Sequence, residues 1–356
     1  MPLVNFYKYK KIFITGHTGF KGSWLCHILK TFDVEVTGFS LPAVEKCHFQ
    51  SCATKNIVNN VIGDINRYAE LEASMRLADP DIVIHMAAQP LVRLSYERPI
   101  ETMQTNIMGT ANVLASALKC SKKPLVACIT SDKCYENLET DKPYKETDRM
   151  GGHDPYSVSK GAAELVAASF AKSFFAPEKQ SILTLRGGNV VGGGDWSRDR
   201  IMTDVVNALA DQTSPVIRNP SAIRPWQHVL DVLNGYLVAI EYMGRQQKGR
   251  FEQFNIGPKS NNEASVGVLA AMACSAWGGK LQPEILEKPT DLHEAKLLKL
   301  DVSKAAKILN WSPKYDLRRT VEKTIEWHKA ELAGSVMSEF TESQILEYFD
   351  GERANA

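Results

Sequence analysis

The chain has 356 residues, of which 44% are hydrophobic and 23% charged, and its formal net charge is +1. This composition is that of an ordinary globular protein with a packed core. The near-neutral charge argues against a nucleic-acid-binding protein, because such proteins usually present a strongly basic face.

The sequence also indicates where in the cell the protein is located and whether it binds a metal ion. No stretch approaches the roughly 20 consecutive apolar residues that cross a bilayer, and residues 1–16 lack the apolar core and cleavage site of a secretory signal. The seven cysteines are scattered and form no C-x-x-C pair, which favours reduced thiols. We therefore expect a cytoplasmic protein without a bound metal.

In the first half of the chain, short β-branched runs alternate with helical segments. Strands are predicted at 11–15, 34–39, 57–62, 82–85 and 125–130, and helices at 22–31, 99–118 and 154–174. Such alternation predicts βαβ units and a parallel sheet. The small residues of the 154–174 helix would let another helix approach closely, so we also expect a helix-to-helix dimer contact.

From about residue 190 the sequence becomes richer in turns, with helices predicted near 229–242, 265–277 and 318–332. The expected fold is α/β, with a Rossmann-type doubly wound parallel sheet at 1–190. A smaller C-terminal α/β lobe at 191–335 is expected to bind substrate, with some segments interleaved. Residues 336–356 are expected to form a poorly constrained tail.

A glycine-rich loop follows the first predicted strand and leads into a helix. Its residues are Gly16, His17, Thr18, Gly19, Phe20, Lys21 and Gly22. Glycines in this G-x-x-G-x-x-G spacing permit a tight turn and a close approach of a pyrophosphate, which then lies on the helix N-terminus. We therefore predict that this loop binds a dinucleotide.

The residues leave open which dinucleotide is bound. The second strand ends in Phe39-Ser40-Leu41, which offers neither a carboxylate for a ribose diol nor an arginine for a 2′-phosphate. Asp64, after the third strand, could accept a hydrogen bond from the adenine amino group. An aspartate that turns the chain at a strand end explains it equally well.

Two further motifs predict chemistry. Tyr156 and Lys160 are four residues apart, on one face of a helix, where the ammonium would favour the phenolate. Ser131, Asp132 and Lys133 follow the 125–130 strand, at the strand end where open α/β sheets hold ligands. Ser131 would hydrogen-bond a reacting hydroxyl, and the acid and the amine would supply proton transfer.

Six separated motifs between about residues 10 and 330 carry a family resemblance: TGHTGFKG, HMAAQPLVRLSY, TSDKCY, DPYSVSK, RGGNVVGGGDW and IRPWQHVLD. Together they resemble the nucleotide-sugar 4,6-dehydratases, which are extended short-chain dehydrogenases/reductases. Most of that family typically has Glu after the strand-end Asp, whereas Lys133 resembles the CDP-sugar branch.

The resemblance implies a lyase that uses tightly bound NAD to convert CDP-glucose into CDP-4-dehydro-6-deoxyglucose and water. Such a step belongs to deoxysugar biosynthesis, as for lipopolysaccharide O-antigen. It implies that Tyr156 takes the C4 hydroxyl proton, that Asp132 protonates the leaving C6 hydroxyl and that Lys133 takes the C5 proton. The replacement of Glu by Lys leaves open which of Asp132 and Lys133 is acid and which is base.

The resemblance also implies further contacts and a homodimer. The cofactor would be bordered by Ile65, Ala87, Ala88, Gln89 and Asn106, and the substrate by Gln89, Arg93, Asn189, Arg200, Arg218, Arg224 and His293. The helices at 99–118 and 154–174 would form a four-helix interface between two copies. The alternatives are a sugar 4-epimerase, a 4,6-dehydratase for another nucleotide sugar, and a regulator that senses dinucleotide without turnover.

Overall fold

The computed structural model describes residues 2–258, 262–286 and 298–353. Its centre is a seven-stranded sheet with the strand order β10-β6-β5-β4-β1-β2-β3, and every neighbouring pair is parallel. The strands are β1 (Lys11–Thr15), β2 (Glu35–Ser40), β3 (Asn59–Ile62), β4 (Ile82–His85), β5 (Leu125–Ile129), β6 (Ile182–Gly187) and β10 (Phe251–Ile256). The predicted Rossmann-type sheet is confirmed. The chain winds outward from β1 in both directions, so a ligand crevice is expected where β1 and β4 meet.

Helices cover both faces of this sheet, each over its own hydrophobic cluster. One face carries α4 (Tyr68–Ala78), α6 (Pro99–Met103), η2 (Gln104–Met108), α7 (Gly109–Ala117), α8 (Pro155–Phe170) and η4 (Ala171–Phe175). The other carries α1 (Pro2–Tyr7), α2 (Phe20–Lys30), α10 (Val229–Arg245), α12 (Ser303–Leu309) and α14 (Met337–Arg353). The elements α6, η2 and α7 follow one another directly and match the predicted helix at 99–118, with a π turn in the middle.

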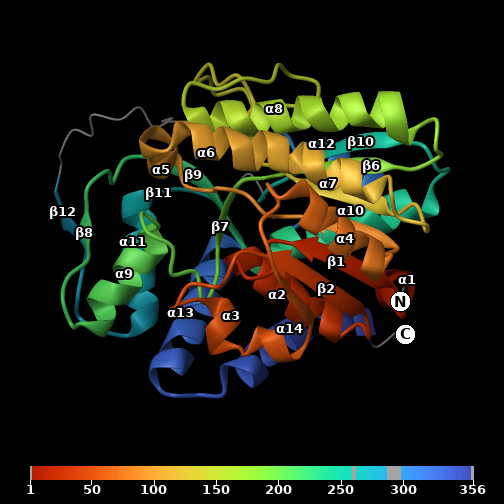
Figure 1. Cartoon of the computed structure of the whole chain (residues 1–356). Coiled ribbons are helices and arrows are strands. Elements are labelled where there is room, and N and C mark those ends of the chain that lie inside the picture. The colour runs from red at the N-terminus through yellow and green to blue at the C-terminus, as the bar shows by residue number, and fades with distance from the viewer. Residues whose placement is uncertain (1, 259–261, 287–297, 354–356) are drawn as a thin grey trace.

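A smaller lobe lies to one side of the large sheet (Figure 1). It contains β7 (Asn189–Val191), α9 (Ile201–Ala210), β8 (Val216–Ile217), β9 (Ile223–His228), β11 (Glu263–Ser265), α11 (Val266–Trp277) and β12 (Glu284–Ile285). The helix α13 (Leu317–Leu332) packs against α11 and α14. Short elements complete the chain: α3 (His48–Ser51), η1 (Thr54–Asn56), α5 (Val92–Glu97) and η3 (Asp132–Cys134). Since β10 and α10 join the large sheet from the second half of the sequence, the two parts interleave.

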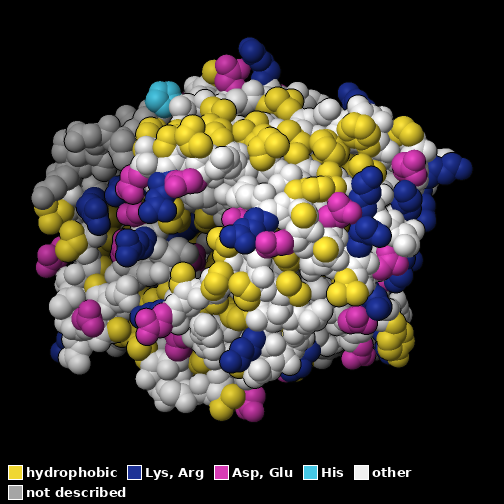
Figure 2. Space-filling model, viewed as in Figure 1, with side chains coloured by type: hydrophobic (Ala, Val, Ile, Leu, Met, Phe, Trp, Pro, Cys, Tyr) yellow, Lys and Arg dark blue, Asp and Glu magenta, His cyan; other side chains and the backbone are white. Residues whose placement is uncertain are grey.

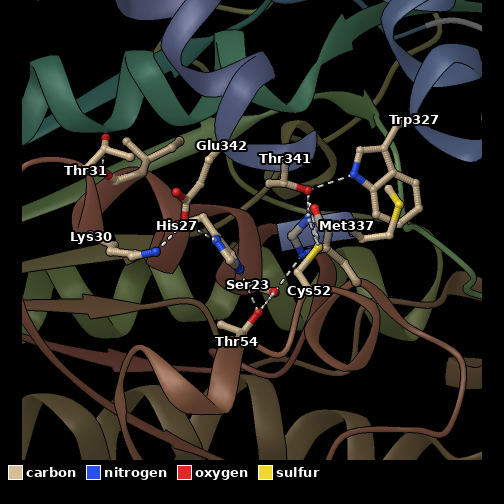
Figure 3. A network of polar contacts seen from close by, with 12 residues as sticks. Ser23, His27, Lys30, Thr31, Cys52, Thr54, Trp327, Met337, Thr341 and Glu342 are labelled. Carbon is tan, nitrogen blue, oxygen red and sulfur yellow. Dashed lines mark hydrogen bonds and ion pairs between the residues drawn. The ribbon is translucent and has the colours of Figure 1, made fainter. Parts of the chain in front are cut away.

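The expectation of a poorly constrained tail was wrong. Residues 337–353 form α14, whose Ile345 and Phe349 are completely buried. Thr341 accepts a hydrogen bond from Trp327 Nε1 at 2.9 Å and lies 3.2 Å from Cys52 Sγ (Figure 3). The apolar spacing 345, 348 and 349 is helical, so one stripe of α14 faces the core.

Within the described ranges, no helix combines the length and the apolar character needed to span a bilayer.

Candidate active site

A cavity of about 330 Å³ opens at the carboxyl ends of β5 and β6, between the large sheet and the smaller lobe. Its floor comes from the start of α2, from the segment after β5 and from Tyr156 on α8. Its other walls come from the segments after β6, before α9 and around β8 and β9. Open α/β sheets hold their ligands at this edge, and the cavity therefore defines the candidate active site.

The β5 segment presents a hydroxyl and a carboxylate to the cavity. Ser131 is extended (φ −156°, ψ 156°), and its Oγ accepts a hydrogen bond from the Lys133 backbone N–H at 3.2 Å, capping the short helix η3. The same Oγ donates to Asp132 Oδ1 at 2.9 Å. The other carboxylate oxygen, Oδ2, is buried and has no hydrogen-bond partner among the described residues. Asp132 therefore has one oxygen held and one available to a ligand.

Tyr156 lines the cavity from the first turn of α8, and Lys160 is buried one turn further along the same helix. Asp154 caps this helix by accepting from Ser157 N at 2.9 Å, and Pro155 follows it, as predicted. Burial raises the pKa of Tyr156 to about 12, while a hydrogen bond with the Ser131 side chain opposes that rise. Burial lowers the pKa of Lys160 to about 8, and its Nζ lies 6.0 Å from the centre of the Tyr156 ring.

Lys21 contributes a cation that sequence reasoning did not place in the cavity. It was predicted only as part of the dinucleotide loop, but its side chain lines the cavity, with Nζ 3.4 Å from the Tyr236 hydroxyl. Burial lowers its pKa to about 8, and Lys160 and Arg200 act in the same direction. No sequence pattern could have found this, since the direction of the side chain depends on how α2 is rotated.

The glycine-rich loop has the geometry that a dinucleotide requires. Gly16 has φ +81°, and a Cβ there would lie 2.6 Å from the Ala87 backbone nitrogen. A Cβ on Gly22 would lie 2.2 Å from the Gly16 carbonyl oxygen. The first turn of α2 begins at Phe20, so its backbone N–H groups face the loop without helical acceptors. The residues present therefore fit a bound pyrophosphate.

The remaining loop side chains tie the loop to β2 and β3. His17 Nε2 lies 2.7 Å from Asn60 Oδ1. Thr18 Oγ1 lies 2.8 Å from Ser40 Oγ at the end of β2. At the end of β2, where a side chain would contact the adenine ribose, Ser40 thus uses its hydroxyl to contact the glycine-rich loop.

The other predicted cofactor residues fall into two groups. Ala87 packs against Gly16, next to Ala88 at the end of β4, and Ile65 is buried against Gly109. Asp64 Oδ1 accepts from Asn66 N at 2.9 Å, the turn contact that was the alternative to adenine binding. Neither Asp64 nor Ile65 lines the cavity as the described residues define it.

Asn106 and Gln89 form a structural pair. Asn106 Oδ1 accepts from Gln89 N at 2.8 Å, and its Nδ2 donates to Ser159 Oγ at 2.8 Å, which links the π turn η2 to α8. The Gln89 amide is used inside the protein, donating to Thr102 Oγ1 at 2.9 Å and accepting from Leu91 N at 2.6 Å. The structure therefore brings Gln89 beside the cavity wall and turns its amide away from the cavity.

Most of the predicted substrate residues line the cavity: Arg93, Asn189, Arg200, Arg218 and Arg224. Two of them carry buried donor atoms, Asn189 Nδ2 and Arg200 Nε, with no acceptor in the described part of the chain. Arg93 pairs with Asp199 at 3.3 Å. Arg224 is buried, whereas Arg218 is exposed at the rim. His293 lies outside the described residues.

Comparison with known proteins identifies the family. A family model described as GDP-mannose 4,6 dehydratase matches residues 13–324. A CDP-glucose 4,6-dehydratase from Salmonella typhimurium is 41% identical over 97% of both chains. The chain belongs to the nucleotide-sugar 4,6-dehydratase family. The predicted resemblance is confirmed, and so is the lyase class at the level of this family.

More distant relatives share the fold. A UDP-glucose 4-epimerase from Mycoplasma pneumoniae is 25% identical and covers 87% of this chain and 94% of its own. An epimerase structure from Methanothermobacter thermautotrophicus superposes with a TM-score of 0.79 at 22% identity, over 94% of this dehydratase-family chain and 96% of the other. A Bacillus cereus UDP-glucuronic acid 4-epimerase, solved with UDP-glucuronic acid and NAD, gives a TM-score of 0.76 at 24% identity, over 90% and 99%.

Proposed function

We propose that this member of the family converts CDP-glucose into CDP-4-dehydro-6-deoxyglucose and water. The observation that carries the proposal is the pair Asp132 and Lys133 at the end of β5, facing the cavity beside Tyr156. A 4-epimerase only oxidises and reduces C4, and it would leave this acid and amine unexplained. The 41% identical CDP-glucose 4,6-dehydratase supports the nucleotide assignment.

The proposed cofactor is NAD. The loop Gly16–Gly22 and the first turn of α2 would hold its pyrophosphate, with Ala87 and Ala88 alongside at the end of β4. At the end of β2 there is neither an arginine for a 2′-phosphate nor a carboxylate, since Ser40 stands there. NAD supplies the hydride acceptor for C4 and the hydride donor for C6.

The chain's own residues would move the protons. Tyr156, near the Lys160 ammonium, takes the proton of the C4 hydroxyl. Ser131 hydrogen-bonds the same hydroxyl and so helps to position it. The 4-ketone makes the C5 proton acidic, and Lys133 accepts it. Asp132 Oδ2, which is free of partners among the described residues, protonates the C6 oxygen as the C6–O bond breaks.

We propose that residues 191–335 form the substrate lobe and residues 1–190 the dinucleotide domain. The elements β10 and α10 are exceptions, because they pack with the large sheet and belong to the dinucleotide domain. Asn189 Nδ2 and Arg200 Nε, which have no acceptor among the described residues, would meet the sugar nucleotide together with the guanidinium of Arg224. Arg93 and Arg218 stand at the rim, where they would meet the diphosphate.

A homodimer is proposed through α6 to α7 and α8. Exposed apolar side chains gather on these helices and their π turns: Ile100 on α6 and Met108 on η2, and Leu165 on α8 and Phe174 on η4. Figure 2 shows a band of hydrophobic side chains over this face. A cytoplasmic location is proposed because all seven cysteines lie in the described part of the chain as buried free thiols.

The test is incubation of the purified protein with CDP-glucose and NAD⁺, followed by mass spectrometry. The expected product is lighter by one water, and no net NADH accumulates. A loss of water with dTDP-glucose or GDP-mannose only would overturn the CDP assignment. An unchanged mass with a new stereoisomer would establish an epimerase, and binding of NAD without conversion of any of these sugars would establish a regulator.

A further inference from the structure

An ion pair lies across the rim of the cavity. Arg93 Nη1 and Asp199 Oδ1 are 3.3 Å apart, and both residues line the cavity. Arg93 belongs to α5, which packs against α6 and α8 on the large sheet. Asp199 belongs to the segment before α9, a helix that packs against α11 in the smaller lobe. The pair therefore joins the two walls between which a substrate has to enter.

The contact between these two side chains is easily replaced. Their exposed fractions are 40% and 45%, so water screens the attraction. A single guanidinium N–H makes the hydrogen bond to Asp199, although an arginine has five N–H donors. Two phosphate oxygens can bind the same guanidinium through two parallel, charge-assisted hydrogen bonds. A diphosphate therefore displaces Asp199 from Arg93, as the substrate contacts proposed above require.

The backbone places the Asp199 carboxylate among groups that are expected to meet phosphate. Its φ of +58° lies in the left-handed region, which aspartate and asparagine adopt more readily than most residues. The next residue, Arg200, precedes the first turn of α9 and also lines the cavity. Its buried Nε has no acceptor among the described residues. The chain thus puts a carboxylate beside two guanidinium groups at the expected diphosphate position.

A carboxylate at this position opposes anion binding, and its effect grows with the charge of the anion. It occupies Arg93, and it also repels each negative charge that enters. At roughly 10 Å in water, one such repulsion weakens binding by about twofold. The diphosphate of a nucleotide sugar carries about two negative charges at neutral pH, a free nucleoside diphosphate about three and a triphosphate about four.

We propose that Asp199 is a specificity-determining residue, which competes with the substrate diphosphate for Arg93 and thereby selects a nucleotide sugar over more highly charged free nucleotides. The inference rests on the nucleotide-sugar binding proposed above. Every nucleotide has to displace the carboxylate from the guanidinium. A free nucleotide also brings a third or a fourth negative charge toward that carboxylate. Asp199 thus lowers the affinity for all of these ligands, and it lowers the affinity for the free nucleotides most.

The experiment measures the binding of CDP-glucose, CDP and CTP by titration calorimetry. The protein is loaded with NADH, because the reduced cofactor accepts no hydride and CDP-glucose then binds without being converted. Asp199→Asn removes the charge and keeps the shape of the side chain. Asp199→Gly is a second variant that suits the left-handed backbone. Thermal unfolding establishes that each variant is folded.

The matched control is Asp211→Asn, which makes the same change of charge at the other end of α9. Asp211 is exposed, and it does not line the cavity as the described residues define it. This control should change the affinity for each ligand by less than about twofold, because the charge is distant from the diphosphate and screened by solvent.

At about 10 mM salt, where screening is weak, Asp199→Asn should bind CDP-glucose about tenfold to twentyfold more tightly. About fivefold of this gain comes from the released Arg93, the upper value for an exposed ion pair, and the rest from lost repulsion. The gain should be about twofold larger for CDP and about fourfold larger for CTP. At about 1 M salt the three gains should shrink toward one.

A second background separates competition for Arg93 from simple repulsion. Arg93→Gln should weaken the binding of all three ligands. When Asp199→Asn is added to Arg93→Gln, each gain should be about fivefold smaller than in the unmodified background, because no guanidinium is left to release. The order CDP-glucose, CDP, CTP should persist, since the repulsion does not depend on Arg93.

An unchanged or weaker affinity of Asp199→Asn for CDP-glucose would mean that Asp199 assists binding, and the proposal would be overturned. Equal gains for the three ligands would overturn the selection by charge. Equal gains in the two backgrounds would overturn the competition for Arg93.

Failure of the proposed function is a separate outcome, because the unmodified protein would then release no water from CDP-glucose in the mass measurement. The titrations are in that case made with the nucleotide sugar that does lose water, and with its free nucleoside diphosphate and triphosphate. The same three comparisons then decide the role of Asp199.

Discussion

Glu164 Oε2 and Arg186 Nη2 lie 2.8 Å apart in the core behind the active site, with both side chains almost fully buried. Glu164 follows Lys160 by one turn of α8, and its two oxygens also accept from Thr130 and Thr184. Since Thr130 precedes Ser131, one ion pair fixes α8 against β5 and β6. It thereby fixes Tyr156 against Ser131.

Breaking this pair should cost stability, because the surviving charge would remain buried. We expect Arg186→Met to lower the free energy of unfolding by about 3–5 kcal/mol in urea denaturation. The double variant Arg186→Met/Glu164→Leu should recover part of that loss. The matched control is Arg76→Met, whose partner Glu72 lies 3.5 Å away at the surface, with an expected change below about 1 kcal/mol. If Arg186→Met and Arg76→Met lowered the free energy of unfolding equally, burial of the ion pair would not explain the effect.

Tyr156→Phe should abolish most activity while leaving the fold intact. The change removes only a hydroxyl, and loss of a positioned acid–base group typically lowers kcat by roughly 10²–10⁴-fold. Steady-state conversion of CDP-glucose measures the loss. Tyr9→Phe is the control, because Tyr9 is 80% exposed and does not line the cavity. An active Tyr156→Phe enzyme would remove Tyr156 from the mechanism.

The pH dependence of kcat/KM should show a falling limb near pH 8. Lys160 has a pKa lowered to about 8 by burial, so above that pH it loses the charge that favours the Tyr156 phenolate. Lys160→Arg keeps a charge and should move the limb to higher pH.

Lys21 has the same lowered pKa, about 8, so a second variant is needed. In Lys21→Met the limb should persist if Lys160 controls it. A limb that disappears in Lys21→Met and stays in Lys160→Arg would transfer the assignment to Lys21.

The sequence predicted best those elements whose pattern is local. The strands at 11–15 and 82–85 coincide with β1 and β4, because apolar β-branched runs buried on both faces end abruptly at polar or glycine residues. The strand β10 was not predicted, because the polar residues Glu252, Gln253 and Asn255 interrupt its apolar run. The helix α14 was missed because its apolar stripe is interrupted by many charged residues.

The same contrast holds in the site. The approach of Ser131 and Asp132 to Tyr156 follows from the rule that parallel strand ends share one edge of the sheet. The inward turn of the Gln89 amide and the reach of Lys21 to Tyr236 depend on side-chain packing against partners distant in sequence. No motif spacing encodes those partners.

Lowering the pH should begin to destabilise the protein at pH values higher than those at which carboxylates titrate. Burial lowers the pKa of His27 to about 4 and the pKa of each of His85, His228 and His328 to about 3. In the unfolded chain these histidines bind protons below about pH 6.5, while the folded state keeps them neutral. The contribution of these neutral histidines to the free energy of unfolding is therefore fully present above about pH 6.5 and is lost progressively as the pH falls toward about 4.

Urea unfolding at pH 7.5, 6.5 and 5.5 measures this slope, to which each histidine adds at most about 1.4 kcal/mol per pH unit. His27→Gln should reduce the slope by about one proton. A stability that is flat over this range would contradict the assignment of neutral buried histidines.

The C-terminal helix should stabilise the fold through Thr341. Its Oγ1 accepts from the buried Trp327 Nε1 at 2.9 Å and lies 3.4 Å from His48 Nε2, within the network of Figure 3 that joins α14 to α2. Thr341→Val keeps the side-chain volume but leaves the indole N–H unsatisfied, at a cost of about 1–3 kcal/mol. Ser343→Ala is the control, because that exposed hydroxyl bonds only locally to the Phe340 carbonyl. The kcat of both variants should match that of the unmodified enzyme at 25 °C, because Thr341 does not line the cavity. A loss of kcat without a loss of stability in Thr341→Val would instead make α14 part of the active-site support.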